Sequence, residues 1–458
     1  MEGFLEAVAK ISGWIWGTPM RVTLVGGGIW LTIALGFFQF RYFPFIMKET
    51  FGKIFHKAEG EGTISPFQAA TSALASTIGA SNIVGVPVAI AFGGPGAIFW
   101  MWVTALVGCS LKFSEVMLGM KYREKNKEGE FVGGPMYYLT KGLKSPFLGG
   151  LFAFGLMLEL APSIATQAVS VVQTASTIGI PKMASGITLT IIVALVVYGG
   201  IKRIAQVTEK LVPFMAILYL IGALIIIFAN AARIPEAFAL IFKYAFTPIA
   251  ATGGFAGAGI AAGMRWGVAR GCYSNEAGMG TAPIAHAAAV TDHPARQAMW
   301  GVFEVIVDTG IVCTTTAILV LTTGIWKDIP ASEAASMPAR AFQALLGDAV
   351  GGGVVTFSIL MFVLSTIIVL VYYGEKQAEY LFGTKFSKFM RVVYVLSIIM
   401  GAVGGIEFLY QFLDILLAII IFPNMIGLIL KTKELKEMKD EFFNDPKYYP
   451  GAKVKNTN

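Results

Sequence analysis

The chain has few charged residues for its length. Charged side chains make up 14% of its 458 residues, hydrophobic ones make up 56%, and the mean hydropathy is +0.70. A soluble domain typically has about 25% charged and 45–50% apolar residues. The apolar excess recurs along the whole chain, and the longest clearly polar stretch is the tail from Lys431 to Asn458. This composition predicts a membrane protein.

Several other features are absent. The three cysteines, Cys109, Cys272 and Cys313, lie far apart in apolar surroundings, which argues against a disulfide framework or a zinc site and indicates packing residues. The N-terminus lacks the pattern of a cleaved signal peptide, so the apolar segments are expected to direct insertion. No HExxH, GxSxG or Walker motif occurs, which argues against an enzyme, an organic cofactor and ATP as the driving force.

Apolar segments long enough to span a bilayer recur through the chain, each requiring roughly 20 residues. By that measure we predict an all-α membrane protein with eleven spans: 19–40, 65–92, 96–121, 148–176, 185–200, 207–230, 255–289, 298–323, 351–381, 388–410 and 412–431. Between the third and fourth, the stretch Phe131 to Leu143 has Tyr137 and Tyr138 near Lys141 and is typical of an interfacial helix.

The basic residues indicate an orientation. With the N-terminus outside, the inner loops and the C-terminal tail carry about 24 Lys and Arg, and the outer segments carry about 7. The positive-inside rule therefore predicts an outer N-terminus and a cytoplasmic C-terminus in a cell (plasma or inner) membrane. The same rule explains the net charge of +7 better than a nucleic-acid partner does.

Eleven spans can be divided into one extra helix followed by two sets of five, an arrangement that indicates an inverted repeat. We predict a single transporter domain, 1–458. It comprises the extra helix 19–40, repeat one 65–230, repeat two 255–431 and a cytoplasmic tail 432–458.

The first span of each repeat has an interrupted helical sequence. Small and hydroxyl residues crowd the centre of Ile64–Gly94, with Pro87 following, and glycines cluster around Pro283 in Arg270–Ala289. Glycine and proline disfavour a continuous helix. Such residues can simply permit close helix packing. Two interrupted spans at corresponding positions instead indicate a transporter's binding site, where freed carbonyls suit Na⁺ or an ammonium group and freed amides suit a carboxylate.

The stretch GGPGAIFWMWVTALVG, from Gly93 to Gly108, resembles the signature of the alanine/glycine:cation (sodium:alanine) symporter family. The resemblance extends through most of the chain, including SNEAGMGTAPIAHAAA, and the motif shows no departure. It implies a LeuT-type fold, with two inverted repeats of five helices whose first helices are unwound. It also implies sodium-coupled uptake of alanine or glycine by alternating access.

The resemblance also implies site residues. Sodium ligands would be the carbonyls of Ala75 and Ile78 and the hydroxyls of Ser365 and Thr366, although such hydroxyls often bond to their own helix instead. The candidate substrate-binding residues are Thr77, Ile78, Gly79, Ala80, Ser81, Asn82, Gln167, Asn275, Glu276, Gly278 and Met279.

Several polar residues have alternative interpretations. Gln167 could bind a carboxylate or join helices. Glu276 is a functional candidate that Arg265 or Arg270 could pair with in an outer gate. We leave three further acids, Glu159, Glu304 and Asp308, outside the predicted site. His286 and His293 are expected at the inner interface, with proton coupling a weaker possibility.

The predicted function is sodium-coupled symport of a small neutral amino acid, with substrate, sodium and the bilayer as partners. The alternative is a proton-coupled or exchanging permease of the same fold, which should tolerate loss of Ser365 and Thr366 far better. A channel is disfavoured because no repeated filter loop or acidic ring is visible.

Overall fold

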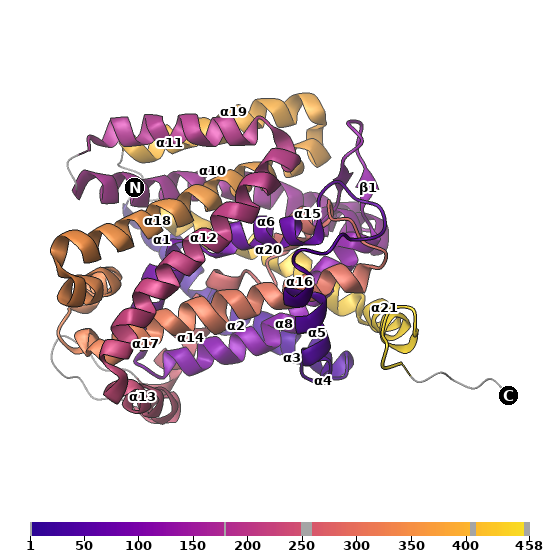
Figure 1. The fold of residues 1–458 in the computed structure, drawn as a ribbon. Coiled ribbons are helices and arrows are strands. Elements are labelled where there is room, and N and C mark those ends of the chain that lie inside the picture. The colour runs from indigo at the N-terminus through magenta and orange to yellow at the C-terminus, as the bar shows by residue number, and fades with distance from the viewer. Residues whose placement is uncertain (1, 178–179, 249–258, 404–408, 453–458) are drawn as a thin grey trace.

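The computed structural model describes residues 2–177, 180–248, 259–403 and 409–452. Helices dominate the described chain (Figure 1), as expected for an all-α membrane protein. One small antiparallel hairpin interrupts them, with β1 (Glu124–Lys125) paired to β2 (Phe131–Val132).

Seven helical segments of the described chain are long and apolar enough to cross a membrane. They are α8 (Ala97–Lys121), most of α10 (Pro146–Thr177), α12 (Gly200–Ala229), the run α16–η6–α17 (Pro294–Val305, Ile306–Cys313, Thr314–Thr323), η8 with α18 (Ala331–Ser336, Met337–Phe382), α19 (Thr384–Val403) and most of α20 (Leu409–Leu430). An eighth is a bent pair, in which α6 (Pro66–Thr77) meets η3 (Ser81–Gly85) and α7 (Val86–Gly93) at 51°. The predicted count of eleven is therefore not confirmed.

The remaining predicted spans are shorter or divided. The segment predicted at 19–40 consists of α2 (Thr18–Arg21), η1 (Val22–Gly26) and α3 (Gly27–Ala34), after which the chain turns at Gly36 and Phe37, both with positive φ. The segment predicted at 185–200 is α11 (Lys182–Val197), of only 16 residues. The one predicted at 255–289 divides into α14 (Ile260–Asn275) and α15 (Ala282–His286), and its first residues lie outside the described ones, as do 404–408 at the end of the tenth.

The predicted interfacial helix at 131–143 is helical only in part. Its residues form β2, α9 (Pro135–Tyr137) and η4 (Tyr138–Gly142), and both tyrosines are buried in the protein. The Tyr138 hydroxyl donates to Asn424 in α20, which explains why this polar group lies inside.

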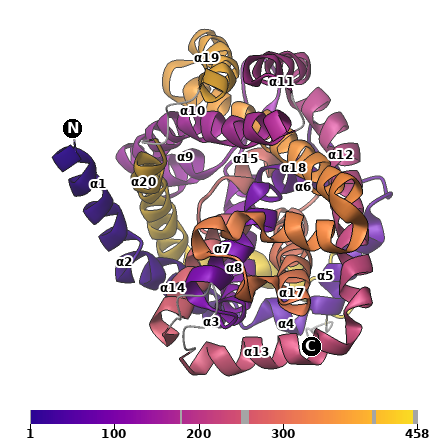
Figure 2. The same cartoon turned by 90° about the vertical axis from the view of Figure 1, so that its left-hand side faces the viewer.

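The other elements lie at the ends and edges of the molecule. They are α1 (Glu2–Ile15), α4 (Phe38–Arg41), α5 (Phe43–Glu49), η2 (Phe51–Lys53), η5 (Ala231–Arg233), α13 (Ile234–Phe246), η7 (Ile325–Lys327) and α21 (Thr432–Asn444). In Figure 2, α6 and α7 lie inside a surround formed by α10, α12, α13, α18 and α20, and α14 lies at the lower left edge beside α2.

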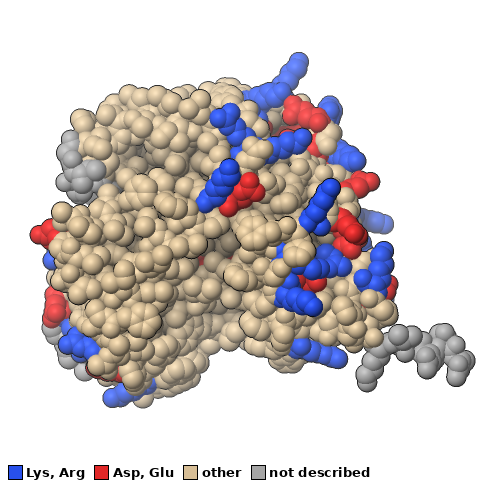
Figure 3. Space-filling view, in the orientation of Figure 1, with Lys and Arg blue, Asp and Glu red and all other residues tan. Residues whose placement is uncertain are grey.

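Charged side chains gather at one end of the molecule. In Figure 3 a broad surface without charge separates a few charged groups on the left from a dense group on the right, where Figure 1 places β1 and α21. We call this right-hand side the charged end. An uncharged belt between two polar ends is the surface that a bilayer-spanning protein requires.

The start of the first divided segment and the end of the second are tied together at the charged end. Residues 60–64 run beside residues 288–291, with bridges between Glu61 and Thr291 and between Ile64 and Ala289. Arg123, just after α8, holds this junction by donating to the carbonyls of Ala287 (3.0 Å), Ala289 (2.7 Å) and Glu61 (2.7 Å).

We expect Arg123→Ala to lower stability by roughly 1–3 kcal/mol, because charge-assisted hydrogen bonds to three carbonyls are lost. The measurement is thermal unfolding of the purified protein in detergent. Lys125→Ala is the control, since Lys125 is exposed, with an ion pair to Glu61 and a contact with the Phe131 ring, and its loss should shift the transition little. Equal shifts for the two variants would contradict this role of Arg123.

Candidate functional site

The first divided helix stops at Thr77 because its backbone finds other partners. A capping box of Ser65 and Gln68 starts α6. At its other end the Gly79 amide donates to the Asn82 side chain (2.9 Å), and Ile78 has a non-helical ψ of 88°. Carbonyls in the last turn of α6 are thereby left without the helical donors that would continue the ladder.

A hydroxyl from α18 meets one of these carbonyls. Thr366 Oγ1 donates to the Ala75 carbonyl (2.9 Å) and to Phe362 in its own helix (3.0 Å). The neighbouring Ser365 points elsewhere, bonding to Phe362 (2.8 Å) and contacting Met215 Sδ (3.4 Å). Of the two predicted hydroxyls, Thr366 is the one placed against α6.

The second divided helix is held by two charged side chains of α8. Lys112 Nζ donates to the carbonyl of Asn275, the last residue of α14 (2.9 Å), and Glu115 Oε1 accepts from the Gly280 amide before α15 (3.0 Å). The linking backbone has positive φ at Glu276, Gly278 and Gly280. Both glycines are required there, since a side chain would be strained in that conformation.

Glu276 lies between the two breaks. Its Oε2 accepts from Thr281 (2.6 Å) and from Ser76 in the last turn of α6 (3.3 Å). The expected pairing with Arg265 or Arg270 is wrong, since the ion pairs among the described residues do not include either with Glu276. Both arginines instead line a separate, larger cavity.

Two adjoining cavities meet at the breaks. A small one of about 50 Å³ is lined by residues of α6, α10, α18 and the Glu276 segment, and has room for roughly three to five water-sized groups. A larger one of about 450 Å³ is bounded by α1, α14 and α20 and contains Trp16, Arg270 and Asp414. Ser81, Gln167 and Tyr273 line both. These three side chains therefore lie between the small cavity and the larger one.

The predicted substrate-binding residues separate into three groups. Those that line the small cavity are Gly79, Ser81, Gln167, Glu276 and Met279. Ala80 lines the larger cavity. The others, Thr77, Ile78, Asn82, Asn275 and Gly278, line neither of these two cavities. Among the predicted sodium ligands, Ala75 and Thr366 are in contact. Ile78 follows Ala75 in the chain, after Ser76 and Thr77.

Asn82 and Asn275 organise a buried polar cluster behind the breaks. Asp308 of η6 accepts from Asn82 (2.5 Å) and Ser274 (2.8 Å), and Thr309 accepts from Asn275 (3.1 Å). All five side chains are at most 1% exposed. This cluster fixes η3 against α14, so these two asparagines support the site from outside its cavity.

Sequence reasoning missed several residues of the site. Lys112 and Glu115 were not singled out, and Glu159 and Asp308 were left outside, although Glu159 lines the small cavity. Each is a charged residue within an apolar span, and that signal alone marks a functional candidate. His286, expected at the interface, is fully buried instead, because it pairs with Glu304.

The seven or eight apolar helices of the described chain are those of a multi-pass membrane transporter. The chain belongs to the sodium:alanine symporter family, whose family model matches residues 1–454. It is therefore a transmembrane amino-acid symporter of that family, as the tryptophan-rich motif indicated.

Relatives cover nearly all of the chain. An uncharacterised transporter of Bacillus subtilis, YflA, is 51% identical over 98% of this chain and 96% of its own. The sodium/alanine symporter AgcS of Methanococcus maripaludis is 42% identical over 95% of this chain and 98% of its own. The crystal structure of MhsT in complex with L-phenylalanine matches with a TM-score of 0.58 at 11% identity, covering 83% of this chain and 93% of that one. This last likeness shows a shared LeuT-type fold.

Gly79 is the position where an added methyl group tests the site most simply. A Cβ there would lie 3.1 Å from Thr366 Oγ1. We expect Gly79→Ala to reduce amino-acid uptake at least tenfold, since about 1.4 kcal/mol of lost interaction is tenfold. The matched control is Gly150→Ala in α10, where the methyl group would meet nothing within 4 Å. Full activity of Gly79→Ala in proteoliposomes would contradict this placement of the site.

Proposed function

We propose that the protein couples inward movement of sodium to uptake of a small neutral amino acid, alanine or glycine. The observation that carries this is the convergence of both helix breaks on one small cavity. Sodium and alanine both appear in the name of the methanococcal relative, of which the chain covers 98%.

Sodium would bind at the carbonyl end of α6. Hard cations take oxygen ligands, and the Ala75 carbonyl and the Thr366 hydroxyl already meet at 2.9 Å. A sodium ion there would replace that hydrogen bond, with the Ile78 carbonyl and the Ser365 hydroxyl turning toward it as further ligands. The carbonyl end of a helix also carries the negative end of its dipole.

The amino acid would occupy the small cavity. Glu276 offers a carboxylate to the ammonium group, while Gln167 and the backbone at Gly79 to Ser81 offer donors to the carboxylate. Asn275, Gly278 and Met279 would position this segment, and Thr77, Ile78 and Asn82 would position the other. The small volume limits the side chain, which favours alanine or glycine over larger residues.

The larger cavity would be the access route from outside. It is lined by Trp16, just after α1, and by Leu413 and Asp414 of α20, and Figure 1 shows α1 on the side away from the charged end. By the positive-inside rule, the charged end would be cytoplasmic. The N-terminus would then face outward and the C-terminal tail inward, in a cell membrane.

The direct test is uptake of labelled alanine into proteoliposomes, with an inward Na⁺ gradient or an equal K⁺ gradient. Accumulation above equilibrium only with Na⁺ supports the proposal. Accumulation driven equally well by a pH gradient in K⁺ would overturn the sodium coupling and favour the proton-coupled alternative. No accumulation of alanine or glycine under any gradient would overturn the substrate assignment.

The two adjacent hydroxyls of α18 give a sharper comparison. We expect Thr366→Ala to raise the Na⁺ concentration for half-maximal uptake at least tenfold, because a ligand that already contacts α6 is lost. Ser365→Ala should raise it less, since that hydroxyl faces Met215 before sodium binds. Thr366→Ser, which keeps the hydroxyl, should stay near the original value. An unchanged Na⁺ dependence in Thr366→Ala would contradict the site.

A further inference from the structure

A second buried polar network leads from the break after α14 to the charged end. Lys112, which holds the Asn275 carbonyl, lies 3.8 Å from Glu304 Oε2, and Glu304 Oε1 lies 2.5 Å from His286 Nε2. His286 Nδ1 in turn lies 2.8 Å from Gln297 Nε2. All four side chains are at most 1% exposed. Buried ionisable groups within a membrane protein are costly and indicate function.

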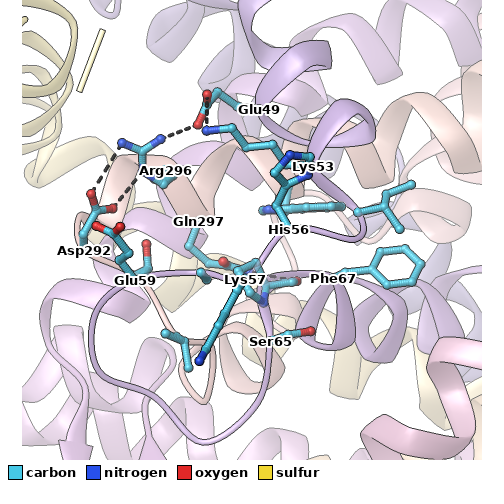
Figure 4. Close-up of a pocket in the computed structure, with 16 residues that line it drawn as sticks. Glu49, Lys53, His56, Lys57, Glu59, Ser65, Phe67, Asp292, Arg296 and Gln297 are labelled. Atoms are coloured by element: carbon cyan, nitrogen blue, oxygen red, sulfur yellow. Dashed lines mark hydrogen bonds and ion pairs between the residues drawn. The ribbon is translucent and has the colours of Figure 1, made fainter. Parts of the chain in front are cut away.

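The network ends at a water-accessible space. Gln297 of α16 lines a cavity of about 270 Å³ at the charged end, together with Ser65 and residues of the segment 53–59 (Figure 4). Figure 4 shows Lys53, His56 and Lys57 around the same space, with Arg296 bonded to Glu49 and Asp292 beside it. His286 is thus one side chain away from a cavity that solvent ions and protons reach.

The hydrogen-bond pattern corresponds to a neutral imidazole. Its Nε2–H donates to the Glu304 carboxylate and its Nδ1 accepts from the Gln297 amide. A protonated imidazole has no acceptor, so its Nδ1–H would require the amide to turn round. Gln297 Oε1 is buried and has no hydrogen-bond partner in the described structure. It is therefore available to accept that proton after the amide turns.

Turning the amide would break a contact with α6. Gln297 Nε2 also donates to the carbonyl of Pro66, the first residue of that helix (3.4 Å). The protonation state of His286 is therefore linked to whether α16 holds the start of α6. Such a side chain with two discrete arrangements is the kind of element that couples a local charge change to a helix movement.

Ionisable side chains surround His286 on several of the elements packed against it. Helix α8 contributes Lys112 and Glu115, α16 contributes Glu304, and α18 contributes Tyr373, while α6 has no ionisable side chain. Beyond the end of α15, Arg123 donates to the Ala287 and Ala289 carbonyls. Glu304 is the acid in direct contact with the imidazole, and Lys112 lies 3.8 Å from the other oxygen of the same carboxylate.

We propose that His286, paired with Glu304, is a proton-binding site reached from the charged end, and that proton binding releases the start of α6 from Gln297. This rests on the proposed function, in which α6 carries the sodium ligands. The proton is exchanged with the solution at the charged end and the sodium gradient remains the driving force. Protonation would speed opening toward that end.

The transport test measures sodium-driven alanine uptake in proteoliposomes buffered equally on both sides, between about pH 6 and pH 8. We expect the uptake rate of the unmodified protein to be several-fold higher at the lowest pH than at the highest. The rate should not depend on pH in His286→Gln, and the midpoint of the pH dependence should lie at lower pH in Glu304→Gln. His56→Gln is the matched control, because His56 is exposed and outside the network, and it should keep the original profile. A His286→Gln profile identical to the unmodified protein's would overturn the proposal.

A readout without transport separates this proposal from the proposed function. The chain has only three histidines, so histidine-selective NMR of the full protein in detergent resolves each one, with His286→Gln giving the assignment. We expect the His286 signal to titrate and its midpoint to fall in Glu304→Gln, even if alanine proves not to be the substrate. A His286 signal fixed over this range would overturn the proton site. If His286→Gln does not fold, Gln297→Leu serves instead. This variant should keep the NMR titration of His286 but lose the pH dependence of alanine uptake. A pH dependence of uptake that is retained in Gln297→Leu would overturn the coupling between His286 and α6.

Discussion

The structure depends on one constraint, which is that backbone groups freed inside a bilayer must find partners. Two helices stop in the middle of the protein, and each interruption leaves carbonyls and amides that cost several kcal/mol apiece if they are buried alone. Their partners come from α8, α18 and α20, so the packing of these helices follows from the breaks. The small cavity exists because both interruptions occur side by side.

The two breaks are satisfied in different ways. Two ionisable side chains, Lys112 and Glu115, hold the backbone on both sides of the break after α14. At the end of α6 the partners are neutral, namely Thr366 on the Ala75 carbonyl and Asn82 on the Gly79 amide. Neutral partners are readily exchanged for an ion, whereas a buried lysine ammonium is not. This difference favours α6 as the position of the proposed sodium ion. The backbone at the α14 break would keep the same partners whether or not the ion is bound.

Local features, such as the ends of helices, could be predicted from the sequence, whereas contacts between residues far apart in the chain could not. The glycine and proline clusters lie where α6 and α14 end, and the predicted hydroxyl pair includes Thr366, which contacts the Ala75 carbonyl; its role as a sodium ligand stays a prediction. Lys112 and Asn275 are 163 positions apart, and no local pattern reveals that they meet. The span count failed to be confirmed because hydropathy does not distinguish a segment that crosses a membrane from one that turns, as at Phe37. Burial of Tyr138 and His286 likewise depends on partners distant in the chain.

The central claim is that sodium and amino acid share one site built on the two breaks. Isothermal titration of the purified protein with alanine, in Na⁺ and in K⁺ buffer, tests it most directly. The account predicts at least tenfold tighter alanine binding in Na⁺, with that difference lost in Thr366→Ala. Equal alanine affinity in the two buffers, or an undiminished sodium effect in Thr366→Ala, would contradict it.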